Sequence, residues 1–492
     1  MSSSPSSSPS PEAVPALDLS SKLSFGVGQI AEGVKTCAFG TYLLFYYNQI
    51  LGLSGDLAGL AIFIALVFDA VTDPIAGSVS DRWRSPRGRR HPFMYASALP
   101  LAVSFVFLFA PMVSVESVGQ GGLFAWMAVF TVLTRASMTL YHVPHMALGA
   151  ELSEDYDERT VLVAMRHFFG AVGFIATYVI GFGYFFLPSP EYPNGQLNPD
   201  VYPTMAGWLG VIMAVTIFWT AWGTRKRVPY MPKPKLLEGD ARVTVKDVLT
   251  ETYQAMQNVS FRWVMFGFIL VIAAWAMAGV VGIYVYTFFW ELDSGQILFA
   301  LLMGPIGSMF GYPFSKLYYG WLDKRNGMIV ASVYWAIVHS IPVLLYLAGL
   351  APEGGTWGAA IFLGMFVALG GLGVGQVVVG IGSVMADIAD ENELDTGRRQ
   401  EGVFFGASAF ANKCSAGLGN LIAGFVLEWI DWPVGENVRT AADIPADTLV
   451  QLAVIAGPVI ALLVIPGALC FRGYRLDRKR LGEIQAELNA AS

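Results

Sequence analysis

The sequence predicts an all-α, polytopic membrane protein. Its 492 residues are 55% hydrophobic and only 14% charged, whereas a soluble protein carries about a quarter charged residues. The apolar residues form long continuous runs between charged or Pro/Gly-rich breaks, and one bilayer span needs ~20 mostly apolar residues. Lipid cannot satisfy free backbone groups, so spans are helices or a closed barrel. Continuous rather than alternating runs favour helices.

Twelve apolar runs divide the chain. We expect membrane helices near residues 23–50, 54–79, 92–115, 121–150, 160–187, 203–223, 261–289, 296–319, 327–350, 356–386, 402–428 and 447–471. The expected organisation is a disordered N-terminal tail (1–22), a six-helix half (23–223), a polar linker (224–260), a second six-helix half (261–471) and a C-terminal tail (472–492).

Lys and Arg gather in alternate loops. The loop after the second run reads DRWRSPRGRRHP, the one after the sixth TRKRVPYMPKPK, and the C-terminal tail FRGYRLDRKR. Basic residues concentrate on the cytoplasmic side of a membrane protein. We therefore expect a multi-pass protein of the cell (inner) membrane with both termini cytoplasmic.

A weak internal repeat relates the two halves. The second run exits into Asp81 and Arg82, and the eighth exits toward DKR; the acidic ELSEDYDER follows the fourth run and ADENELDTGRR the tenth. Two six-helix halves facing each other across a cavity is the major facilitator arrangement. Ordinary solvated loops are the alternative. If the halves rock, we expect the gating contacts to come from Asp81, Arg82, Glu151, Asp387 and Arg398.

Two carboxylates lie in the apolar second run, in VFDAVTDP. A central charge costs ~2.5–3.5 kcal/mol on insertion scales, so it normally faces a cavity or a partner. Asp69 and Asp73 share one helix face, and adjacent carboxylates need a cation between them. With the Thr72 hydroxyl, they are expected to bind a coupling ion, Na⁺ or H⁺. The alternative is that they only pair with Lys413 or Arg135; Arg135 itself we assign to helix packing.

Four further polar residues are expected to contact substrate. Lys413, among the small residues of AFANKCSAG, points to the carboxylate pair or to an anionic substrate. Arg166 suits bidentate binding of phosphate, carboxylate or sugar hydroxyls, or pairs with the acidic loop EDYDER. His142 would line the cavity. Glu32 is at i,i+3 to Lys35, and the two are expected to pair with each other.

Motifs of catalysis and ATP use are absent. The sequence holds no nucleophile elbow, P-loop or dinucleotide fingerprint. Its three cysteines form no disulfide framework or spaced metal motif. We expect no enzyme activity, no cofactor beyond the coupling ion and no nucleic-acid partner, but a monomer in the lipid bilayer.

Three stretches carry a family resemblance. FDAVTDPIAG, SDRWRSPRGRRHPF and YHVPHMALGAELSEDYDERT resemble the glycoside–pentoside–hexuronide:cation symporters, the melibiose permease-like branch of the major facilitator superfamily. The resemblance implies that Asp69 and Asp73 bind the coupling cation. It also implies that Lys413 and Arg166 correspond to the family's helix 11 lysine and helix 5 arginine.

Two departures bear on the substrate. Gly33 and His142 stand where the family's sugar binders use aspartates. TCAFG, DAVTDP, YHVPHMAL and EGVFF resemble the sodium-dependent lysophospholipid transporter branch, in which the lysine is thought to meet the lipid phosphate. The resemblance therefore implies a cation-coupled symporter working by alternating access, with a preference for a lysophospholipid or other anionic amphiphile. A sugar or glycoside is the alternative, and a non-transporting membrane sensor is the alternative of another class.

Overall fold

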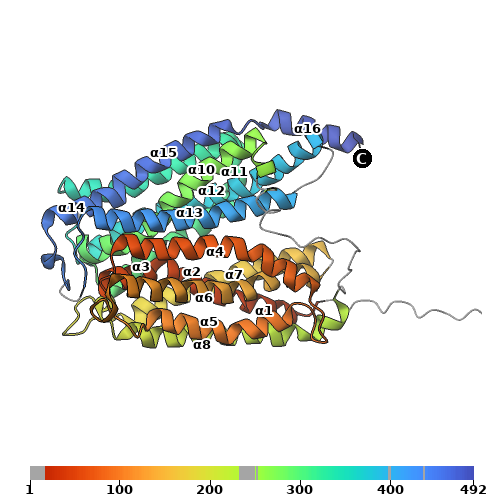
Figure 1. Ribbon diagram of the computed structural model, residues 1–492. Helices are drawn as coiled ribbons and strands as arrows, with labels where there is room; N and C mark the ends of the chain where they lie inside the picture. Colours follow the sequence, from red (N-terminus) through yellow and green to blue (C-terminus); the bar gives the residue numbers. More distant parts are fainter. Residues whose placement is uncertain are drawn as a thin grey trace, which may run out of the picture.

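The computed structural model describes residues 17–153, 155–231, 250, 253–396, 401–435 and 438–491. Its helices form two groups lying side by side, α1 to α8 below and α10 to α15 above (Figure 1). We call these groups the N-terminal bundle and the C-terminal bundle. Their division falls in the stretch expected to be the linker, of which residues 232–249 lie outside the described part of the chain.

The N-terminal bundle holds long helices and short π-helical or 3₁₀ segments. In chain order these are α1 (Leu19–Val27), α2 (Gln29–Cys37), η1 (Ala38–Tyr42), α3 (Leu43–Phe45), η2 (Tyr46–Ile50), α4 (Gly55–Arg82), α5 (His91–Phe109), α6 (Val115–Leu152), α7 (Tyr156–Ile180), η3 (Gly181–Phe185), η4 (Gly195–Leu197), α8 (Val201–Thr224) and η5 (Arg225–Tyr230).

The C-terminal bundle is built in the same way and ends in a further helix. Its elements are α10 (Val259–Tyr284), η6 (Val285–Phe289), α11 (Ser294–Leu347), α12 (Trp357–Thr396), α13 (Glu401–Trp429), η7 (Ala441–Asp443), α14 (Ala446–Val454), η8 (Ile455–Val459), α15 (Ile460–Cys470), η9 (Phe471–Gly473) and α16 (Arg478–Ala491).

The expected apolar runs lie largely on helices, although the run 92–115 continues past the end of α5 at Phe109. Within the described ranges, nine helices are long and apolar enough to cross a membrane. The runs 296–319 and 327–350 both fall in α11, whose 54 residues are broken by a non-helical backbone at Asp323 (φ 60°, ψ 160°). The run 23–50 is divided among α1, α2, η1, α3 and η2. The all-α polytopic class is confirmed.

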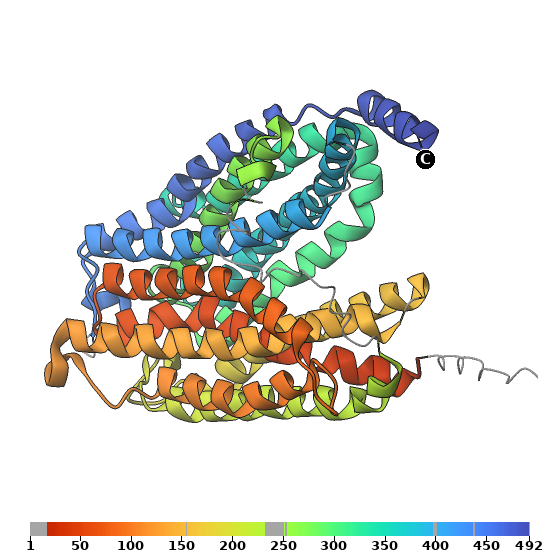
Figure 2. The same cartoon turned by 45° about the vertical axis from the view of Figure 1, so that its right-hand side comes forward.

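The two bundles meet closely at one end and spread apart at the other, where the C terminus lies (Figure 2). At the closed end, side chains bond across the bundles. The Trp432 indole donates to Gln49 at 2.7 Å, and the Tyr284 hydroxyl donates to Asn48 at 2.9 Å. Arg82, at the end of α4, belongs to the basic loop that we expect to be cytoplasmic. The spread end is therefore the expected cytoplasmic end.

Glycines let α4 and α13 pack face to face between the bundles. A Cβ at Gly424 would collide with the carbonyl oxygen of Gly55, and a Cβ at Gly59 would lie 2.9 Å from the carbonyl oxygen of Asn420. Small residues allow such close helix approach in membranes. This contact places Lys413 of α13 opposite the carboxylates of α4.

Candidate functional site

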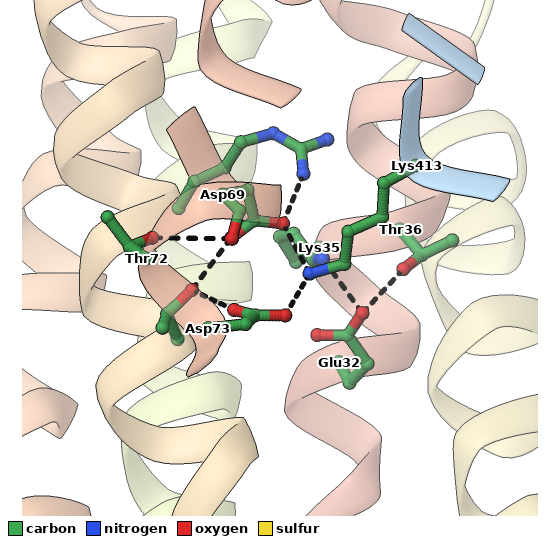
Figure 3. A network of polar contacts seen from close by, with 9 residues as sticks. Glu32, Lys35, Thr36, Asp69, Thr72, Asp73 and Lys413 are labelled. Carbon is green, nitrogen blue, oxygen red and sulfur yellow. Dashed lines mark hydrogen bonds and ion pairs between the residues drawn. The ribbon is translucent and has the colours of Figure 1, made fainter. Parts of the chain in front are cut away.

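Two carboxylates of α4 and one lysine of α13 form the centre of the site (Figure 3). The Lys413 Nζ lies 3.0 Å from Oδ2 of Asp69 and also contacts Oδ2 of Asp73. The two aspartates are four residues apart on one helix, so both reach the same ammonium group. The contact between Lys413 and the pair is thus an ion pair between the two bundles. This is the arrangement that the sequence left as the alternative to ion binding.

A second cation contacts Asp69 from within the N-terminal bundle. Nη1 of Arg135, on α6, lies 3.0 Å from the same Oδ2 of Asp69, and its guanidinium stands over the Phe39 ring. Arg135 therefore does more than pack helices together, the role that the sequence had suggested. Its side chain is a direct counter-ion of the acidic pair.

A threonine hydroxyl joins the two carboxylates on their other side. Oγ1 of Thr139, on α6, lies 2.7 Å from Oδ1 of Asp69 and 2.8 Å from Oδ1 of Asp73. A hydroxyl has one hydrogen to donate, so it can satisfy one of these oxygens and not both. The two Oδ1 atoms therefore share one hydroxyl hydrogen. Three oxygens converge here between α4 and α6, and oxygens are the ligands that hard cations prefer.

Burial separates the four charged groups into two kinds. The side chains of Asp69 and Arg135 are 7% and 8% exposed, whereas those of Asp73 and Lys413 are 27% and 29% exposed. The first pair is enclosed by protein. The second pair is accessible, so its members can exchange partners with a dissolved ion or ligand.

Thr72 does not join the acidic pair through its side chain. Its hydroxyl donates to the backbone carbonyl of Asp69 at 3.3 Å, as threonines in membrane helices commonly do. The side-chain hydroxyl that does meet both carboxylates is that of Thr139. Arg135, Thr139, His142 and Met146 lie at spacings of four, three and four along α6, a one-face pattern from which Arg135 and Thr139 could have been found.

A cavity of ≈ 480 Å³ with several polar side chains in its walls lies beside this centre. Glu32, His142 and Arg166 line it, with Gln29 and Thr36 among the others. The expected pairing of Glu32 with Lys35 is confirmed at 2.7 Å. Lys413 does not line this cavity, so the structure divides the four expected substrate contacts into three cavity residues and one ion-pair residue.

Several polar groups of the cavity lack partners. Among the described residues, Oε1 of Gln29, Oε2 of Glu32 and Nδ1 of His142 are buried and have no hydrogen bond. Arg166 pairs with no carboxylate in that part of the chain; its guanidinium lies against the sulfur of Met146. Because buried polar atoms are normally bonded, these groups suit a polar ligand. Gln29 was missed because an isolated glutamine gives no periodic or charge signal.

The expected gating residues lie in two separate clusters. Asp81 and Glu151 both bind Arg90, the latter at 2.8 Å, and these contacts stay inside the N-terminal bundle. Lys324 lies 2.5 Å from Asp387 in the C-terminal bundle. Arg82 ends α4, and Arg398 lies outside the described residues.

Tyr474 completes the second cluster. Its hydroxyl donates to Asp387 at 2.6 Å. Burial, followed by the neighbouring charge of Asp387, holds the pKa of the Tyr474 phenol well above its ordinary value. The phenol therefore stays a hydrogen-bond donor at any physiological pH.

The described residues form no multi-carboxylate metal centre around these groups. In the portions of the chain with described coordinates, no group of three or more His, Cys, Asp or Glu side chains could hold a metal ion. A cation at the acidic pair would depend on two carboxylates and the Thr139 hydroxyl, oxygen ligands of the kind that hard cations prefer.

Two solved transporter structures share the architecture of this chain. The nucleoside transporter NupG, as its D323A mutant, matches with a TM-score of 0.61 at 14% identity over 93% of this chain and 99% of that chain. The xylose transporter XylE from E. coli, in an inward open conformation, matches with a TM-score of 0.60 at 13% identity over 94% and 98%. The predicted major facilitator fold is confirmed.

Curated relatives span nearly the full length of the chain. The inner membrane symporter YicJ of Escherichia coli is 23% identical over 94% of this chain and 92% of its own. The isoprimeverose transporter of Lactiplantibacillus pentosus is 24% identical over 93% and 89%. The sodium-dependent lysophosphatidylcholine symporter 1 of Gallus gallus is 23% identical over 97% and 91%.

The family assignment rests on a match to most of the sequence. The family described as MFS/sugar transport protein matches residues 24–478, which include the acidic pair, the lysine and the cavity beside them. The resemblance to the cation symporters is thereby confirmed, and this chain, a membrane transporter rather than an enzyme, belongs to the MFS/sugar transport protein family.

Proposed function

We propose that this protein is a cation-coupled symporter that works by alternating access as a monomer in the cell (inner) membrane, with both termini cytoplasmic. The observation that carries the proposal is the ion pair of Lys413 with Asp69 and Asp73, which joins the two bundles. Removing one member of a buried ion pair leaves an uncompensated charge. A cation that replaces the charge of Lys413 would let the bundles separate at this point without leaving both carboxylates uncompensated.

The coupling ion, Na⁺ or H⁺, enters on the side of the pair that faces Thr139. The two Oδ1 atoms and the Thr139 hydroxyl present three oxygens and one hydrogen. When Lys413 leaves, a proton or a sodium ion here supplies the positive charge that Lys413 provides in this structure. The more exposed Lys413 and Asp73 then part, while the enclosed Arg135 keeps its contact with Asp69.

For the substrate, the unpartnered cavity atoms favour a sugar or glycoside, hexuronides included. Oε1 of Gln29 and Oε2 of Glu32 accept hydrogen bonds and have no donor within the described chain. Sugar hydroxyls donate, whereas a lysophospholipid phosphate only accepts. Arg166 would bind a carboxylate or hydroxyls bidentately. The name of the isoprimeverose transporter agrees with this class.

A lysophospholipid or other anionic amphiphile is the second candidate. The partly exposed ammonium of Lys413 offers a cation to a phosphate once the coupling ion has displaced it from Asp73. The relationship to a sodium-dependent lysophosphatidylcholine symporter supports this alternative.

Transport by the reconstituted protein tests the proposal. Liposomes containing the full chain are given an inward Na⁺ or H⁺ gradient and a radiolabelled panel of glycosides, hexuronides and lysophosphatidylcholine. We expect one ion gradient to drive accumulation, and Asp73→Asn to abolish it. Ligand binding without accumulation would identify a sensor and overturn the proposal. Accumulation of lysolipid that ignores Lys413→Ala would remove Lys413 from lipid recognition.

A further inference from the structure

A second cavity lies inside the C-terminal bundle, apart from the ion-pair centre. It has a volume of ≈ 290 Å³ and is lined by residues of α10, η6, α11, α12 and η8. No residue of the acidic pair or its cation partners lines it. Trp275, Trp335 and Phe366 are among its walls. The proposed transport cycle uses none of these residues.

The walls exclude charge and offer hydrogen-bond donors. Of the described residues, no Asp, Glu, Lys or Arg lines the cavity. Trp275 and Trp290 both line the cavity. Their indole N–H groups have no acceptor in the described chain. Nε2 of His339 lies 2.8 Å from the Ala456 carbonyl, so this nitrogen carries a hydrogen and donates it. A charged ligand would be unstable here, while one with an acceptor oxygen would satisfy an indole.

Glycines keep the cavity open. Gly279 and Gly282 lie three residues apart on α10 and line it, and a Cβ at either would meet no atom within 4 Å. An aromatic wall is supplied by Trp335 and His339. Their rings stack with centroids 4.5 Å apart and with planes 12° from parallel. An apolar cavity of ~150 Å³ is enough to hold benzene, so this one has room for a larger aryl or alkyl group.

We propose that this cavity binds an uncharged aryl or alkyl moiety that carries a hydrogen-bond acceptor oxygen next to it. The acceptor meets the indole N–H of Trp290 or Trp275, and the apolar part fills the space beside Gly279 and Gly282. The ligand is either the apolar portion of the transported molecule or a separate amphiphile drawn from the bilayer. The inference goes beyond the proposed symport, because it assigns a site that the ion-pair centre does not share.

Photolabelling of the full chain in lipid nanodiscs tests the site. Two probes are used: a β-glucoside with an aryl-diazirine aglycone, and lysophosphatidylcholine with a diazirine in its acyl chain. Peptide mass spectrometry is expected to find label on residues 275–290 or 335–343 with at least one probe. Gly282→Leu fills the cavity and should lower this labelling at least about tenfold, the effect of ~1.4 kcal/mol of lost binding.

A matched glycine controls for damage to the fold. A Cβ at Gly207 of α8 also meets no atom within 4 Å, and Gly207 is not among the cavity residues, so Gly207→Leu should leave labelling unchanged. Label that survives Gly282→Leu, or that never reaches these segments with either probe, overturns the proposal. Trp290→Phe, which keeps an aromatic ring and removes the donor, should weaken labelling by whichever probe reaches the cavity.

Competition separates the two sources of ligand. Unlabelled glycoside that removes the label assigns the cavity to the transported molecule, and removal by added phospholipid assigns it to a bilayer amphiphile. The Asp73→Asn variant, which should not transport, is expected to label as the wild type does. Failure of symport and failure of this site therefore give different results.

Discussion

The ammonium of Lys413 lies 3.0 Å from Oδ2 of Asp69, and this contact joins α13 to α4 across the two bundles. The same oxygen receives Arg135 from α6. Asp69 is thus held by one cation from each bundle, and only the contact with Lys413 has to break when the bundles separate. One contact of Asp69 is thus enclosed and the other is partly exposed, which suits a site where an ion replaces one cation and leaves the second in place.

Loss of the replaceable cation should make the protein depend on added ion. Lys413→Ala removes a contact of Asp69 and one of Asp73, so we expect unfolding stability to fall by ~1–3 kcal/mol, less than for a fully buried pair because Lys413 is partly exposed. Added Na⁺ or acid should raise the unfolding stability of Lys413→Ala by more than it raises that of the wild type. Thermal unfolding in sodium against choline chloride at equal ionic strength measures it.

The control for this variant is Lys316→Ala, which removes an exposed lysine of α11. Its response to ion should match that of the wild type. Equal ion responses of Lys413→Ala and the wild type would mean that no ion takes the vacated position.

Loss of the fixed cation should be more harmful. Arg135→Gln leaves the enclosed carboxylate of Asp69 with less compensation, at a cost of ~3–5 kcal/mol. Asp69→Asn in the same chain removes the charge that Arg135 neutralises, so the double variant should be more stable than the sum of the single effects predicts. Chemical unfolding of the four proteins gives the coupling energy. Strict additivity would show that Arg135 serves helix packing alone.

The hydroxyl of Thr139 should be needed for ion binding. Thr139→Val keeps the shape and removes the oxygen shared by Asp69 and Asp73, so the ion concentration for half-maximal transport should rise about tenfold. Thr139→Ser restores the oxygen and should restore the affinity. Thr72→Val is the matched control, because the Thr72 hydroxyl bonds a backbone carbonyl. A stronger effect at Thr72 than at Thr139 would contradict this assignment.

Close packing of α4 on α13 should be required for the closed end. Gly424→Val would push a side chain into the backbone of Gly55, so we expect lower thermal stability and lost transport. Gly406→Val, in the same helix but with nothing within 4 Å of its Cβ, should leave stability close to that of the wild type. Cross-linking between cysteines placed at Asn48 and Tyr284 would report the closed end directly. Unchanged cross-linking in Gly424→Val would show that the helices can part without opening it.

Local patterns predicted the parts of the site that lie on one helix. The shared face of Asp69 and Asp73 and the pairing of Glu32 with Lys35 follow from spacings of four and three residues. Thr139 escaped notice because a membrane-helix threonine usually bonds its own backbone. Arg135 was assigned to packing because nothing in a single helix says which neighbour it faces. The break of α11 at Asp323 was expected as a loop, since its charged residues mark a boundary without specifying the backbone.

By itself the sequence determined that the chain crosses a membrane as helices, where those helices lie, and that buried charges concentrate in a few of them. Composition and helical periodicity extend over tens of consecutive residues, so the sequence alone predicts the membrane helices. Only the tertiary structure decided that Lys413 meets a carboxylate 344 residues away, that Thr139 joins the acidic pair, and that Gln29, Glu32 and His142 share one cavity. These contacts depend on how closely the glycine faces let helices approach and on the angle at which the helices cross. No local sequence pattern specifies how close two distant helices come.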